Sequence, residues 1–148
     1  MNEPFVLTLC ALAGVVAYAA LHNGIVGLQR PVHRTHLLFA VVCAAIAANV
    51  GAKTGGYRAS TPDGLVRMSR VEIGASIVFA GVLPWFVGAY LNIRARRLQV
   101  AMSLACALFF IANLSSPWGL VFAAMPAATE VTLPWGERVT DLRVFHPT

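Results

Sequence analysis

Few side chains in this sequence are able to do chemistry, and the first candidate among them is His22. It lies near the end of a long apolar stretch that begins at Phe5. An imidazole inside a membrane span could bind haem iron or a chlorophyll magnesium ion, or could carry protons. The alternative, which we favour, is a hydrogen bond from His22 to Asn23 or to a neighbouring helix. A haem held by two histidines needs the second one at a similar depth on a facing helix, and residues 37–52 and 71–92 contain none.

The second candidate, Glu72, stands at the edge of another apolar stretch, two residues after Arg70. An acidic side chain in a membrane protein can belong to an ion pathway, but a position at the edge favours a local ion pair or a contact with lipid headgroups. The sequence has no paired nucleophile and base, no phosphate-binding glycine loop and no metal-ligand spacing. We therefore predict no enzyme activity, no catalytic residue, no metal site and no cofactor beyond contact with lipid or with pigment held by partners. His22 is kept as the cofactor-binding candidate.

The composition shows what kind of structure must position these side chains. Hydrophobic residues make up 58% of the 148 residues, charged residues only 11%, and the mean hydropathy is +0.72. Soluble domains carry about 25% charged residues. The stretch 71–91, VEIGASIVFAGVLPWFVGAYL, holds a single charge and has arginines on both sides. It predicts a transmembrane helix, which we expect to begin near Pro62 after a cap at Ser60 or Thr61.

The other apolar stretches predict three more membrane spans. We expect an all-α integral membrane protein in which residues 1–128 form a four-helix transmembrane module. The spans are predicted at about 5–28, 37–52, 71–92 and 98–114, with an interfacial segment at 118–128. The glycine-containing segment 53–60 is expected to be a loop.

Small residues on these spans predict faces that pack on other helices, because they let two backbones approach closely. Alanines recur every four residues on the second span, and glycines interrupt the third. The predicted partner-packing residues are Ala40, Ala44, Ala48, Gly81 and Gly88. Asn49 is expected to form a hydrogen bond to a neighbouring helix. Tryptophan is common at membrane–water interfaces, so Trp85, Trp118 and Trp135 are the predicted interfacial anchors.

Residues 129–148 have a different pattern, in which β-branched or apolar residues alternate with polar ones. This pattern predicts a short extramembrane tail of two strands around a turn at 134–136. Two strands alone leave unpaired edges and are not stable in water, so we expect the tail to pair with a partner. The residues expected to make this pairing are Val131, Leu133, Val139, Leu142 and Val144.

The net charge of +5 comes from short basic clusters beside the spans. That arrangement indicates lipid headgroups and membrane topology, and no nucleic-acid partner is expected. The segments 29–36 and 93–97 together hold five arginines. Placing both segments in the cytoplasm puts both termini in the periplasm. We expect a multi-pass protein of the bacterial inner membrane.

Two short motifs suggest a relationship. Residues 115–120 read SSPWGL after the last span, and residues 133–137 read LPWGE soon afterwards. Together with the order of elements, these motifs resemble the amino-terminal multi-span membrane sensor module of bacterial histidine kinases and diguanylate cyclases. The resemblance implies a helical membrane module without catalytic residues. In those proteins, signalling domains follow the module, and no such output domain occurs in this sequence.

We therefore expect a non-catalytic accessory or structural subunit of a larger bacterial membrane complex, photosynthetic or respiratory. It would pack on other membrane subunits and on lipids through its helices, and its tail would pair with a partner. One alternative is a fragment of a membrane sensor or receptor that signals through a separate protein. A further alternative is an electron-transfer subunit that carries haem or pigment on His22.

Overall fold

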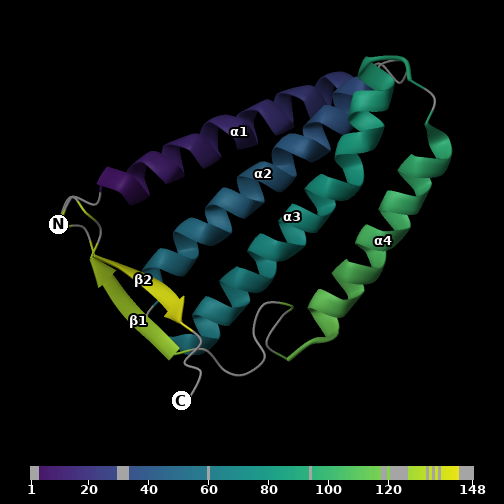
Figure 1. The fold of residues 1–148 in the computed structure, drawn as a ribbon. Coiled ribbons are helices and arrows are strands. Elements are labelled where there is room, and N and C mark those ends of the chain that lie inside the picture. Colours follow the sequence, from purple (N-terminus) through teal and green to yellow (C-terminus); the bar gives the residue numbers. More distant parts are fainter. Residues whose placement is uncertain are drawn as a thin grey trace.

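The described part of the chain forms four long α-helices followed by two short strands (Figure 1). The structure is a computed structural model that describes residues 4–29, 34–59, 61–93, 95–117, 120, 127–132, 134, 136 and 138–143. The helices are α1 (Pro4–Gln29), α2 (Arg34–Arg58), α3 (Pro62–Tyr90) and α4 (Arg96–Ser115), and the strands are β1 (Ala127–Thr132) and β2 (Arg138–Arg143). As the sequence predicts, all four helices are long and apolar enough to cross a membrane.

The helices lie side by side in a row that follows the order of the chain (Figure 1). Among the described residues, extensive contacts link α1 to α2, α2 to α3 and α3 to α4. Helices α1 and α4 therefore lie at the two ends of the row, and each packs mainly on one neighbour. Many of their large apolar side chains are exposed, Leu21 and Leu108 among them. Such exposure carries little cost in a bilayer, because lipid tails are as apolar as leucine.

Helix α2 continues well past the end predicted from the sequence. We expected a span that stops near residue 52 and a loop at 53–60, but the helix runs to Arg58, so that prediction is wrong for most of the segment. The reason is a tertiary contact with α3. A Cβ atom at Gly55 would come within 2.9 Å of the Met68 sulfur, so glycine serves here for close helix packing and not for a turn.

Helix α3 begins at the predicted cap. Thr61 is the N-cap, and its hydroxyl accepts a hydrogen bond of 3.2 Å from the backbone N–H of Gly64. Pro62 occupies the first turn, where its missing N–H has no helical partner to lose, and Asp63 places a negative charge at the positive end of the helix dipole. Local sequence signals therefore determine this boundary.

The apolar parts of α3 and α4 match in length. Residues 71–90 of α3 extend about 30 Å and residues 98–115 of α4 about 27 Å at 1.5 Å per residue, close to the thickness of a hydrocarbon core. The two helices run in opposite directions (Figure 1). Arg70 and the end of α4 at Ser116 therefore lie at one level, at the same end of the helix row.

Strands β1 and β2 form a two-stranded antiparallel sheet, with Ala127 opposite Arg143 and Thr132 opposite Arg138. Gly136, between the strands, has a φ of 86°, a conformation that glycine adopts readily. β2 contacts α2 and β1 contacts α3, so the sheet lies at the end of the row where α2 finishes and α3 starts (Figure 1).

Several of the predicted tail and interface residues are outside the described part of the chain. These are Trp118, Leu133, Trp135 and Val144, together with residues 121–126 of the expected interfacial segment. Its last two residues, Ala127 and Ala128, belong to β1, so the expected boundary of the tail at residue 129 moves to 127.

Candidate functional site

A long apolar groove runs along α3, with α2 and α4 as its walls. It consists of two adjoining pockets of about 350 and 410 Å³, which share Val78 and Phe110. We call this feature the α3 groove. Small residues contribute to its lining, among them Gly74 and Gly81 of α3 and Ala107 of α4. Because these residues have little or no side chain, the groove keeps its depth although the helices are close together.

Close contact between α3 and α4 depends on the same glycines. A Cβ atom at Gly74 would lie 3.2 Å from the Phe110 ring, and one at Gly81 would lie 3.2 Å from the Cβ atom of Cys106. Both distances are shorter than ordinary van der Waals contact between carbon atoms. The two glycines thus set the separation of the helices that form the groove.

One end of the groove is polar and is organised by Arg70 of α3. Its Nη2 donates hydrogen bonds to the carbonyl oxygens of Ser116, at 2.7 Å, and of Pro117, at 2.9 Å. The carboxyl end of a helix carries unpaired carbonyl groups and the negative end of the helix dipole. The Arg70 guanidinium therefore caps α4 and ties its end to α3.

Asn113 of α4 lies beside Arg70 and is 0% exposed. Its Nδ2 donates a hydrogen bond of 2.9 Å to the Arg70 carbonyl oxygen. Two buried atoms at this place, Asn113 Oδ1 and Arg70 Nε, have no hydrogen-bond partner among the described residues. A buried polar atom without a partner costs about 1–3 kcal/mol. The polar end of the groove is therefore lined by two residues that each have one unpaired polar atom, the acceptor Oδ1 of Asn113 and the donor Nε of Arg70.

The other end of the α3–α4 contact is held by a second set of hydrogen bonds. Trp85 Nε1 donates to Ser103 Oγ at 2.8 Å, and Ser103 Oγ donates to the Gly81 carbonyl oxygen at 3.3 Å. Gln99 Nε2 donates to the Pro84 carbonyl oxygen at 3.1 Å. Trp85, a predicted interfacial anchor, thus has its indole N–H bound between two helices.

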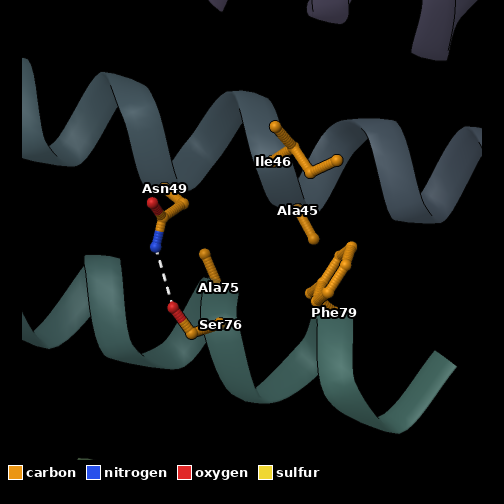
Figure 2. Close-up of a pocket in the computed structure, with 6 residues that line it drawn as sticks. All are labelled: Ala45, Ile46, Asn49, Ala75, Ser76 and Phe79. Carbon is orange, nitrogen blue, oxygen red and sulfur yellow. Dashed lines mark hydrogen bonds between the residues drawn. The ribbon is translucent and has the colours of Figure 1, made fainter. Parts of the chain in front are cut away.

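A smaller pocket of about 220 Å³ lies between α2 and α3 and is shown in Figure 2. Asn49 and Ser76 point toward one another there, and Asn49 Nδ2 donates to Ser76 Oγ at 2.8 Å and to the Glu72 carbonyl oxygen at 3.0 Å. This confirms the hydrogen bond expected of Asn49. The Glu72 carboxylate lies 3.9 Å from Lys53 Nζ, so its ion pair is formed with α2. These bonds connect α2 to α3.

His22 lies on the outside of α1, away from these contacts. Its side chain is exposed, and its ring stacks on Tyr18 with 6.2 Å between the ring centroids. The polar contact between α1 and α2 is made instead by Asn23, whose Oδ1 lies 2.9 Å from His36 Nδ1. Within the described part of the chain, no group of three or more His, Cys, Asp or Glu side chains could hold a metal ion.

No family model, curated protein or solved structure matches this chain. The resemblance to sensor modules therefore stays a prediction based on two short motifs.

The structure distributes the predicted packing residues over two environments. Gly81 and Gly88 are buried against the chain's own α4, and Ala40 is buried opposite Gly24 of α1. Ala44 and Ala48 are exposed, and Ala48 also lines the α3 groove.

The sequence reasoning missed Asn113 and Gln99, and it treated Arg70 only as a charge flanking a span. The sequence does contain a signal for the two amides, because each is a polar residue within the apolar stretch of α4. The structure shows both side chains buried. Polar residues in membrane spans usually bond to a neighbouring helix. No sequence pattern connects Arg70 with the end of α4, which is 46 residues away in the chain.

Proposed function

We propose that this chain is a non-catalytic accessory subunit that packs against another protein in a bacterial inner membrane. The observation that carries the proposal is the exposed outer face of α1 at the end of the open row. We call this surface the α1 face, and it comprises Cys10, Gly14, Tyr18 and His22.

The α1 face has the properties of a helix-packing surface. Its four residues recur at intervals of four and spread over about 120° of the outer surface of the helix. All four are exposed, and a Cβ atom at Gly14 would meet nothing within 4 Å. A glycine on an open surface lets another helix approach closely, and the stacked rings of Tyr18 and His22 offer a large contact area one turn away.

The depth of His22 in the membrane supports a protein neighbour. Helix α1 has 26 residues and is about 39 Å long, or about 9 Å longer than a hydrocarbon core. His22 lies roughly 10 Å from the helix end, so a symmetrically placed α1 puts the imidazole inside the hydrocarbon. Ionisable side chains at such depth almost always face protein or a water-filled cavity. Because α2 packs on another side of α1, that protein belongs to a second chain.

The tail supports the same proposal. A two-stranded sheet keeps one unpaired edge on each strand, and such sheets are marginal in water unless they are extended or covered. The register places Val131 opposite Val139 and Leu142 opposite Ala128. We propose that a partner completes this sheet on the periplasmic side, where the tail and both termini are expected to lie.

The experiment is to tag the full chain in its native membrane, solubilise the membrane gently, and measure the size, protein content and visible spectrum of the particle. We expect a particle much larger than the chain itself. The double variant Tyr18→Ala/His22→Ala should release the chain, and deletion of residues 129–148 should weaken the association. The matched control is Leu12→Ala, because Leu12 is also exposed on α1 but lies about 120° around the helix from Tyr18.

Two results would replace the proposal with one of its alternatives. A small colourless particle for the unaltered chain would contradict a stable complex and favour a sensor fragment that meets its partner only during signalling. A visible spectrum that remains with the purified single chain and is lost in His22→Ala would favour a haem- or pigment-carrying subunit. Equal behaviour of the double variant and Leu12→Ala would exclude the α1 face as the contact surface.

A further inference from the structure

We propose that the α3 groove binds one anionic phospholipid, with its phosphate at Arg70 and Arg67 and an acyl chain along the groove. This inference concerns the face between α2 and α4, and it does not depend on a protein partner at α1.

The polar end of the groove carries two arginines, Arg67 and Arg70, that form no salt bridge with a described carboxylate. Among the described residues the ion pair is Lys53 with Glu72, and neither Arg67 nor Arg70 forms one. Arg67 is exposed and lies one turn before Arg70 on the same side of α3. Arginine is well suited to phosphate, because its planar guanidinium presents several N–H donors in a fixed geometry.

Arg70 retains donors for a headgroup after it caps α4. The guanidinium has five N–H groups, and the hydrogen bonds to Ser116 and Pro117 both come from Nη2. Arg70 Nε is without a partner among the described residues, as is the acceptor Asn113 Oδ1 beside it. Both of these atoms are buried, so a headgroup would contact the Nη groups at the outer end of the guanidinium, whose remaining N–H donors suit phosphate oxygens. Phosphatidylglycerol offers such a phosphate together with a net negative charge.

The depth of the groove fits an acyl chain. Arg70 immediately precedes the apolar part of α3, so it lies at the boundary between headgroups and hydrocarbon. The residues of α3 that line the first pocket lie between Arg70 and Val78, a length of about 12 Å, and one leaflet of the hydrocarbon core is about 15 Å deep. The second pocket continues the groove past Val78 toward Trp85. Both pockets are almost wholly apolar in lining apart from Arg70, Asn113, Ser103 and the Trp85 N–H.

The test measures lipid binding to the full chain in detergent by native mass spectrometry. Phosphatidylglycerol or phosphatidylcholine with the same acyl chains is added at increasing concentration, and the fraction of chain with one bound lipid is recorded. We expect the dissociation constant for phosphatidylglycerol to be lower on the order of tenfold, the size expected of one charge-assisted contact. Arg67→Gln should reduce this preference without removing the cap that Arg70 provides to α4.

A matched pair of variants tests the position of the acyl chain. Ala107 and Ala105 are both exposed on α4, but only Ala107 lines the groove. Two residues apart on a helix, they point about 160° away from each other. Ala107→Phe should fill the groove and weaken phosphatidylglycerol binding about tenfold, and Ala105→Phe should leave binding unchanged.

Three outcomes would overturn the proposal. Equal affinity of the unaltered chain for the two lipids would remove the role of charge. Equal binding of phosphatidylglycerol by the two phenylalanine variants would place the lipid elsewhere. Loss of lipid binding when a second copy of the chain or another protein is added would assign the groove to a helix of that protein.

Discussion

Arg70 Nη2 donates a hydrogen bond of 2.7 Å to the carbonyl oxygen of Ser116 and so fixes the carboxyl end of α4 on α3. A hydrogen bond to a charged group contributes about 1.5–3 kcal/mol. We therefore expect Arg70→Gln to lower the free energy of unfolding by an amount in this range, measured by thermal unfolding in detergent. The control is Arg67→Gln, which removes the same charge from an exposed side chain. If both variants lose the same stability, the cap does not hold α4.

The boundaries of the helices could be predicted where local chemistry decides them. Thr61, Pro62 and Asp63 form a helix start that is visible in the sequence, and α3 begins there. The end of α2 could not be predicted in this way. The glycine pair after residue 54 normally indicates a loop, but the contact of Gly55 with Met68 extends the helix, and that contact exists only after α2 and α3 have packed.

The groove could not be predicted from the sequence for a similar reason. Its polar end depends on Asn113, whose amide reaches the Arg70 carbonyl across 43 residues of chain, and on the end of α4. The sequence marked small residues as packing positions. However, an α-helix has 3.6 residues per turn, so alanines four residues apart are offset by about 40° and come to face different neighbours. Ala40 is consequently buried, whereas Ala44 and Ala48 are exposed. Which neighbour each residue meets follows from the order of the helices in the row.

Gly88 and Gln99 form a contact that leaves no space for a side chain at position 88. A Cβ atom at Gly88 would overlap Gln99 Nε2 and lie 3.2 Å from the Ile93 carbonyl oxygen. We expect Gly88→Ala to destabilise the chain, because Gln99 must give up its hydrogen bond to Pro84. Gln99→Ala alone should cost about 0.6 kcal/mol, and at most about 1.7 kcal/mol, as hydrogen bonds between membrane helices do.

The double variant Gly88→Ala/Gln99→Ala makes this prediction specific. It should lose less stability than the sum of the two single variants, because the group that the new methyl displaces is already gone. Gly51→Ala is the control, since a Cβ atom there would meet nothing within 4 Å. Additive losses in unfolding experiments, or an equal loss for Gly51→Ala, would contradict the assigned contact.

Asn49 and Ser76 connect α2 to α3 at the pocket of Figure 2. We expect Asn49→Ala to cost more stability than Ser76→Ala, because the Asn49 amide also donates to the Glu72 carbonyl oxygen and keeps that bond when Ser76 is changed. A double-mutant cycle should give a coupling energy of about 0.6 kcal/mol. A coupling energy of zero would mean that the hydrogen bond contributes nothing to the contact between the helices.

The proposed orientation places the amino end of α3 in the periplasm and the amino end of α4 in the cytoplasm. Asp63 and Arg97 are exposed near these two ends, so each offers a position for a single cysteine. In a chain whose Cys10, Cys43 and Cys106 have been replaced by alanine, we expect Asp63→Cys to react with a membrane-impermeant maleimide in intact spheroplasts. Arg97→Cys should react only after permeabilisation, because the arginines at 94, 96 and 97 favour the cytoplasmic side.

The reverse labelling pattern would invert the topology. It would bring the tail, together with Arg67 and Arg70 at the polar end of the groove, to the cytoplasmic side. Labelling of both positions from outside would contradict an odd number of membrane crossings between them.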